Sequence, residues 1–159
     1  RFSETVIDIL DDRFKALDLF PIGRLDKDTE GLLILTTDGK LAHKLLSPKQ
    51  LVPKTYFAII DGVVDYSDIE LFEKGMPLEE DFTTIPAKLE IISPGKVYIT
   101  IYEGKFHQVK RMFGYIGKKV IYLKRVQMGN LKLDETLLPG EARELTEHEI
   151  KLLKASIKS

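Results

Sequence analysis

A charged loop bracketed by glycines leads directly into a short apolar run, and this join most constrains how the chain folds. The loop covers residues 23–31, and the apolar run covers residues 32–35. Apolar runs of this length, closed by a turn signal such as residues 36–39, are typical of buried strands. The loop is therefore predicted to hold its ionisable side chains at the mouth of a rigid element, where binding and catalytic groups concentrate. A solvated turn is the competing interpretation of any one aspartate in this loop.

The size and composition of the chain are those of one globular domain. Its 159 residues are 43% hydrophobic and 31% charged, which is enough for a proper core. No apolar run approaches the roughly 18 residues of a membrane span, and no signal peptide is visible. The absence of cysteine excludes disulfides, a thiolate nucleophile and cysteine-ligated zinc, and His43, His107 and His148 are too scattered to suggest a metal site. These features favour a cytoplasmic protein with no membrane partner.

The net charge of −1 conceals an uneven distribution along the chain. Residues 61–90 carry nine acidic side chains against two lysines, whereas residues 101–132 carry eight basic side chains against Glu103 alone. Binding of a polyanion depends on the local field and not on the total charge. The pattern therefore predicts a basic face, although a charged surface with evenly spread residues stays open as the alternative.

Hydrophobic periodicity predicts strands with helices set between them, which is an α+β pattern and not a regular βαβ alternation. Helices are expected over residues 3–17 with Ser3 as cap, over 40–46 and 67–74, around 109–116, and after Thr146, whose capping box includes Glu149. Residues 76–85 are polar and acidic and are expected to be an irregular surface excursion. The predicted strands are residues 20–22, 32–35, 54–60, 87–92, 96–102, 120–123 and 131–133.

A second stretch, residues 103–113, is expected to join a strand to a helix through Gly104. Val109, Met112 and Phe113 have the spacing of one buried helical face. A helix start beside basic residues can bind an anion, because free N–H groups and the helix dipole add to the side-chain charge. An amphipathic surface helix with basic side chains directed to solvent is the competing interpretation.

The string Gly-Arg-Leu-Asp-Lys-Asp-Thr-Glu-Gly-Leu-Leu, residues 23–33, resembles the signature loop of the RsuA/RluB/RluE/RluF family of ribosomal RNA pseudouridine synthases. The resemblance implies a mixed, mainly antiparallel β-sheet with flanking helices, with Asp26 as the catalytic aspartate. The Lys-x-Tyr pattern at residues 54–56 implies that Tyr56 is the active-site tyrosine. The segment 103–113 matches the third motif of the family, and this implies that Lys110 forms an ion pair with Asp26. The resemblance implies neither a metal nor an organic cofactor.

The activity implied by the resemblance is isomerisation of a uridine in ribosomal RNA to pseudouridine, with an aspartate nucleophile. Segments 74–78 and 85–87 resemble the branch that modifies small-subunit 16S rRNA, and a 23S target stays open. Arg24 is expected to contact phosphate, or else to pair with Asp28 or Glu30. The full set of expected RNA contacts is Arg24, Lys27, Lys105, His107, Gln108 and Arg111.

Residues 1–159 are expected to be the catalytic domain, acting as a monomer on ribosomal RNA or an assembling small subunit. Family members carry an S4-type RNA-binding domain and a first catalytic strand before the region that matches Arg1, so the sequence is expected to be a fragment. Two other functions fit parts of the pattern. One is a non-catalytic rRNA-binding assembly factor; the other is a metal-dependent phosphotransfer enzyme that uses Asp26, Asp28 and Glu30.

Overall fold

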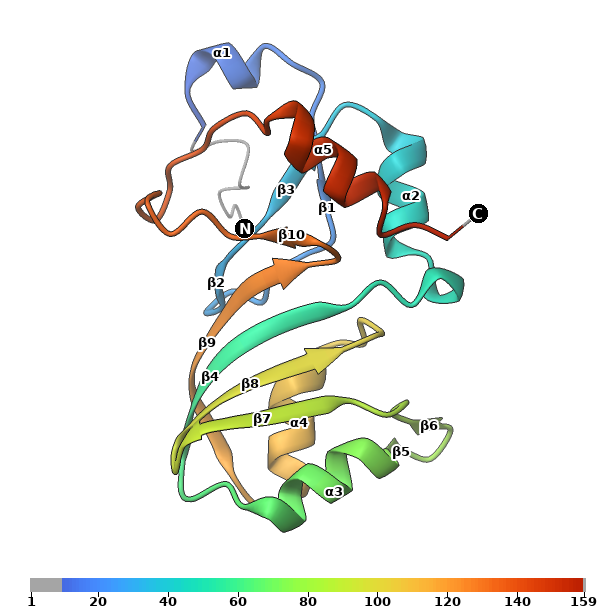
Figure 1. Ribbon diagram of the computed structural model, residues 1–159, viewed down its shortest axis with the longest axis vertical. Helices are drawn as coiled ribbons and strands as arrows, with labels where there is room; N and C mark the ends of the chain where they lie inside the picture. The colour runs from blue at the N-terminus through green and yellow to red at the C-terminus, as the bar shows by residue number, and fades with distance from the viewer. Residues whose placement is uncertain (1–9, 159) are drawn as a thin grey trace, which may run out of the picture.

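A twisted, mainly antiparallel sheet forms the centre of the molecule (Figure 1). The computed structural model describes residues 10–158. The strand order is β10-β9-β4-β8-β7, and β2 (Glu30–Gly31) adds to β9 in parallel. The predicted α+β class is therefore confirmed. The bounds of the other strands of this sheet are β4 Lys54–Asp61, β7 Lys88–Ser93, β8 Lys96–Ile101, β9 Lys119–Met128 and β10 Leu131–Lys132.

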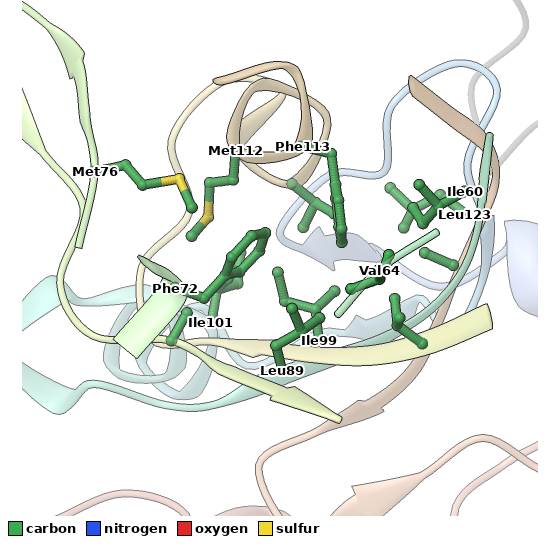
Figure 2. Close-up of a cluster of buried hydrophobic side chains, with 14 residues drawn as sticks. Ile60, Val64, Phe72, Met76, Leu89, Ile99, Ile101, Met112, Phe113 and Leu123 are labelled. Carbon is green, nitrogen blue, oxygen red and sulfur yellow. The ribbon is translucent and has the colours of Figure 1, made fainter. Parts of the chain in front are cut away.

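Helices α3 (Tyr66–Lys74) and α4 (Gln108–Tyr115) cover one face of the sheet and enclose the larger core. Figure 2 shows Phe72 and Phe113 from these helices above the strand residues Leu89 and Ile99. Both phenylalanines are fully buried, with ring centroids 5.0 Å apart. Helical spacing on one side and strand alternation on the other therefore place apolar side chains against each other, as the sequence predicts.

A smaller core lies at the β10 end of the sheet, among α2 (Gly39–Leu46), α5 (Glu147–Lys154) and the strand pair β1 (Phe20–Ile22) and β3 (Ile34–Thr36) (Figure 1). Asp38 caps α2, and the predicted capping box of Thr146 and Glu149 begins α5. A short 3-10 helix, residues 48–50, follows α2. The buried members of this core are Ile22, Ile34, Ala42, Leu45, Val52, Met128, Leu131 and Leu153.

Two predicted elements near the start of the chain are wrong in extent. The predicted helix 3–17 is reduced, among the described residues, to α1 (Asp12–Lys15), and its proposed cap Ser3 lies outside those residues. The run 32–35 is not one buried strand. Its start stays beside β9, where the Leu32 N–H donates to the Arg125 carbonyl oxygen at 2.7 Å, whereas Ile34 begins the pair with β1. The run is divided because two different partner strands compete for it.

Residues 76–85 also differ from the prediction, since they form a short hairpin of β5 (Pro77–Glu79) and β6 (Phe82–Thr83). Met76 and Thr84 are both buried, and the Thr84 hydroxyl accepts the Met76 N–H at 2.8 Å. These contacts hold a polar, acidic segment in register.

β9 is longer than the predicted 120–123, because its later residues pair with β4. Across the described residues, no helix has the length and apolar character needed to cross a membrane.

Candidate active site

The loop that carries Asp26 connects β1 to β2 and depends on its final glycine. Gly31 has a φ of 109°, and a Cβ atom at this position would lie 2.2 Å from the Arg125 carbonyl oxygen. Only glycine permits so close an approach of two backbones. Within the loop, the Thr29 N–H donates to the Asp26 carbonyl oxygen at 2.9 Å. The parallel β2–β9 pair therefore places Asp26 beside the central strands.

Asp26 opens onto a cleft of about 540 Å³ that Tyr56 also lines. This volume lies within the range of small-molecule and nucleotide pockets. Tyr56 stands on β4 directly opposite Arg125 on β9. The loop, the start of β4, the inner side of β9 and the turn before α4 form the walls. Their polar lining residues include Arg24, Asp26, Thr29, Lys54, Tyr56, Glu103, Lys105, His107, Gln108 and Arg125.

The turn before α4 brings His107 to the cleft in a strained backbone conformation. His107 has φ 50° and ψ 34°, a left-handed geometry that non-glycine residues adopt uncommonly. Gln108 follows it, buried, and its side chain accepts the Lys105 N–H at 3.2 Å and donates to Glu103 at 3.1 Å. Gln108 thus holds the turn together from inside and directs His107 toward Asp26.

Asp26 lies between two basic side chains from this helix start. Its Oδ1 is 3.6 Å from Nε2 of His107, and its Oδ2 is 3.7 Å from Nζ of Lys110. The Asp26 and Lys110 side chains are each 26% exposed, so solvent screens them only in part. The ion pair between Lys110 and Asp26 that the resemblance implied is present.

Lys110 has a second and closer partner that the sequence did not indicate. Its ammonium also donates to Oδ1 of Asp28, and this hydrogen bond holds the pKa of Asp28 below its usual value of 3.8. Asp28 is highly exposed, with 75% of its side-chain surface accessible. The lysine therefore bridges two carboxylates of the loop and joins it to α4.

The remaining predicted RNA contacts have different surroundings, and Lys27 and Arg111 are not among the residues that line the cleft. Arg24 is exposed and lines the cleft, and Lys27 is exposed on the same loop. Lys105 lies over the Phe82 ring, with Nζ 5.1 Å from its centroid. Arg111 donates to Glu79 at 2.6 Å and to the Phe106 carbonyl oxygen at 3.1 Å. Gln108 differs from these residues because it is buried and its side chain supports the turn.

The alternative ion pairs considered for Arg24 are not formed among the residues that the structure describes. Asp28 pairs with Lys110, and Glu30 accepts a hydrogen bond from the Tyr122 hydroxyl at 2.8 Å. Burial of Tyr122, together with this bond, raises the pKa of the phenol to about 12. Arg24 is therefore left facing the cleft.

The basic segment 101–132 does not form the uniform face that its composition predicts. Lys118 pairs with Asp68 at 3.3 Å, and Lys124 pairs with Glu135 at 2.9 Å. Arg125 is 2% exposed. Folding thus brings acidic side chains against the basic ones, and two of them, Asp68 and Glu79, come from residues 61–90. Basic side chains lie at the cleft because the fold places them there, and not because the segment contains many basic residues.

Two cleft residues, Lys54 and Arg125, were missed as site residues. Lys54 is 9% exposed, and desolvation, followed by repulsion from Arg125, lowers the pKa of its ammonium. Nε of Arg125 donates to the Leu32 carbonyl oxygen at 2.9 Å, whereas its buried Nη2 has no partner among the described residues. Strand alternation was the available signal, because Lys54 and Tyr56 share a face of β4.

The loop carboxylates do not converge as a metal-dependent mechanism would require. Asp26 faces His107 and Lys110, whereas the Glu30 carboxylate is bonded to Tyr122. Over residues 10–158, no group of three His, Cys, Asp or Glu side chains is arranged to hold a metal ion. The arrangement instead presents one carboxylate, flanked by two basic side chains, to a cleft with an aromatic wall.

Comparison with known proteins identifies the family of this chain. Residues 2–115 match the family model described as RNA pseudouridylate synthase. An uncharacterized RNA pseudouridine synthase of Bacillus subtilis (strain 168) is 50% identical over 95% of this chain and 65% of its own length. The ribosomal small subunit pseudouridine synthase A of Vibrio cholerae is 47% identical over 94% of this chain and 64% of its own length.

A solved structure described as a pseudouridylate synthase superimposes with a TM-score of 0.89 at 42% identity, over 94% of this chain and 65% of that one. The chain thus spans slightly less than two thirds of the length of the curated relatives it matches. Asp26, Tyr56 and Lys110 all lie within the region that the family model matches. This chain belongs to the RNA pseudouridylate synthase family.

Proposed function

We propose that residues 1–159 are the catalytic domain of an enzyme that isomerises a specific uridine of 16S ribosomal RNA to pseudouridine, with Asp26 as nucleophile. One observation carries the proposal. Asp26 and Tyr56, from separate segments of the chain, line one cleft, and Lys110 from a third segment lies 3.7 Å from the Asp26 carboxylate. A non-catalytic fold has no need of this convergence.

The reaction exchanges one glycosidic bond for another with no net change in atoms. Asp26 forms a covalent bond to the nucleotide, which divides one difficult step into two easier ones. The N1–C1′ bond breaks, the uracil turns, and the C5–C1′ bond forms. The bond between Asp26 and the nucleotide breaks again, which frees the carboxylate for the next turnover. The proton on C5 is then removed and N1 gains a proton. Tyr56 lines the same cleft, where its ring is proposed to hold the base and its hydroxyl to accept the C5 proton.

Access to the cleft requires the uridine to leave its helix or stack, as for other enzymes that modify a base. Arg24, Lys27, Lys105 and Arg111 are proposed to contact the flanking phosphates, and binding is expected to weaken steeply with salt. His107 is proposed to contact the nucleotide from beside Asp26. Gln108 is proposed to act through the turn that it supports.

Small-subunit rRNA is the proposed target because the Vibrio cholerae relative is named for that subunit. We also propose that the protein acts as a monomer in the cytoplasm. A 23S target is the second candidate, since the geometry of the cleft is equally suited to it. A non-catalytic assembly factor would keep the RNA contacts but would have no use for Asp26 in an ion pair with Lys110.

The test is to map pseudouridine by carbodiimide-dependent reverse-transcription stops on undermodified 16S and 23S rRNA. The wild-type protein is expected to produce one new stop in 16S rRNA, and Asp26→Asn is expected to produce none while it still binds RNA. A stop in 23S rRNA would change the target, and a stop made by Asp26→Asn would remove the nucleophile assignment. Binding without a stop from either protein would favour the assembly factor. Full activity in EDTA is expected and separates the synthase from a metal-dependent enzyme.

A further inference from the structure

Phe106 is an exposed aromatic residue beside the cleft, and the proposed reaction makes no use of it. It is 76% exposed, the most exposed of the large hydrophobic side chains in the described part of the chain. A single exposed apolar residue is common on protein surfaces and by itself means little. The immediate surroundings of Phe106 are what set it apart.

The inner face of the Phe106 ring is already stacked. It lies on the His107 imidazole with ring centroids 3.7 Å apart and an angle of 23° between the planes. The same imidazole reaches Asp26, with Nε2 3.6 Å from Oδ1. The His107 imidazole therefore contacts the Asp26 carboxylate and also the Phe106 ring, which is open to solvent.

The backbone holds Phe106 in this position at some conformational cost. Nη1 of Arg111 donates to the Phe106 carbonyl oxygen at 3.1 Å, and His107 keeps its left-handed geometry. Non-glycine residues in such geometry persist where the surroundings enforce it, and they concentrate at functional sites. Lys105 and His107, the chain neighbours of Phe106, both line the cleft, so the ring lies directly outside it.

We infer that Phe106 is a stacking site for an RNA base, namely the base adjacent to the uridine that enters the cleft. The inference rests on the proposed function. When a nucleotide leaves its stack, its neighbour loses a stacking partner, and this loss is part of the cost of extrusion. An aromatic ring at the mouth of the cleft replaces that partner. Phenylalanine has no hydrogen-bonding group, so the site accepts any base and contributes affinity and not sequence selection.

The first measurement is kcat/KM for pseudouridine formation in 16S rRNA. Phe106→Ala and Phe106→Leu are each expected to lower it about tenfold, the effect of losing one base–aromatic contact, whereas Phe106→Trp stays within about twofold. Tyr66→Ala is the matched control, since Tyr66 is 72% exposed and lies on α3. Because both side chains are exposed, thermal unfolding should be unchanged in every variant. Wild-type activity in Phe106→Ala, or in Phe106→Leu, would overturn the stacking role.

A second measurement does not require turnover. A short single-stranded RNA with one uridine and 2-aminopurine on its 3′ side is bound to each variant, and fluorescence reports stacking of the analogue. The complexes of wild type and Phe106→Trp are expected to be quenched, and those of Phe106→Ala and Phe106→Leu to be brighter. Equal fluorescence in all four would overturn the inference. The wild type could form no pseudouridine and still quench the fluorescence, as Phe106→Trp does and Phe106→Ala and Phe106→Leu do not. In that case the proposed function fails and the stacking site stands.

Discussion

The two sides of the cleft are held in place by different kinds of contact. On one side, α4 buries Val109, Met112 and Phe113 in the larger core, and its start carries His107 and Lys110. On the other side, the Asp26 loop is half-buried or exposed along its length. Its position depends on the two-residue strand β2, and on Lys110 across the gap.

The two sides therefore differ in how firmly they are held. The helix side is part of the cooperative core, so it is as stable as the domain. The loop side is anchored by a short strand pair and an exposed ion pair, and contacts of that kind open locally at low cost. Changes to the buried face of α4 should therefore appear mainly in stability, and changes to the contacts that hold the loop against the cleft should appear in activity beyond any loss of stability.

The largest expected effect is on stability, from Phe113→Ala on the helix side. Removing a fully buried ring that packs against Phe72 is expected to lower the free energy of unfolding by about 3–5 kcal/mol. Urea denaturation measures it. Tyr115→Ala, at a 51% exposed position of the same helix, is the control and should cost far less. Comparable losses in the two variants would contradict the assignment of α4 to the core.

Lys110→Ala tests the contact between the two sides. Loss of the ammonium near Asp26 is expected to lower kcat/KM about a hundredfold, equivalent to about 2.7 kcal/mol of transition-state stabilisation. Lys118→Ala is the matched control, because Lys118 pairs with Asp68 on α3 and lies outside the cleft. Both are assayed under conditions where the proteins are fully folded. Equal losses would reduce Lys110 to one basic residue among many.

Gly31→Ala tests the anchor of the loop side. The new Cβ would lie 2.2 Å from a backbone oxygen that has no room to move, so the β2–β9 pair should break. The substitution is expected to lower the free energy of unfolding by about 2 kcal/mol. Hydrogen exchange of the Leu32 amide should become faster. Activity should fall by more than the loss of stability explains. Gly114→Ala is the control, since nothing lies within 4 Å of its Cβ position. Normal Leu32 protection in Gly31→Ala would show that β2 is not the anchor.

The smallest effect expected is a shift in one titration. The hydrogen bond from Lys110 holds the pKa of Asp28 below 3.8, so Lys110→Met should raise that pKa toward its usual value, measured by carboxyl carbon NMR. Because the folded pKa is lowered, the contact is complete above pH 3.8 and is lost as pH falls through the lowered value. Lys118→Met should leave Asp28 unchanged. An unshifted Asp28 in Lys110→Met would mean that the loop is not tied to α4 through this pair.

Local pattern was enough to predict the elements with strong periodicity. The strand that carries Tyr56 and the helix that carries Lys110 were both predicted near their observed positions, because burial of one face leaves a period of two or of 3.6 in the sequence. The α5 start was predicted from Thr146 and Glu149, since a capping box involves only neighbours in sequence.

Local patterns gave wrong predictions where long-range contacts decide the structure. Residues 32–35 have the composition of one strand but divide between β9 and β1, and composition does not say which of two edges a strand joins. The segment 76–85 looked irregular because its hairpin is held by burial of Met76 and Thr84, and the polar composition of the segment does not reveal that burial. Tertiary contacts override weak local preference in both cases.

The sequence by itself determined the family, the fold class and the residues to examine, Asp26, Tyr56 and Lys110, because the motifs and their supporting periodicities are local. Only the tertiary structure decided which charges meet. It directed Lys110 toward Asp28 as well as Asp26, brought acidic partners against the basic segment, and buried Lys54 and Arg125 in the wall of the cleft. The physical reason is that ion pairing and desolvation depend on distance and burial in three dimensions, which spacing along the chain does not encode.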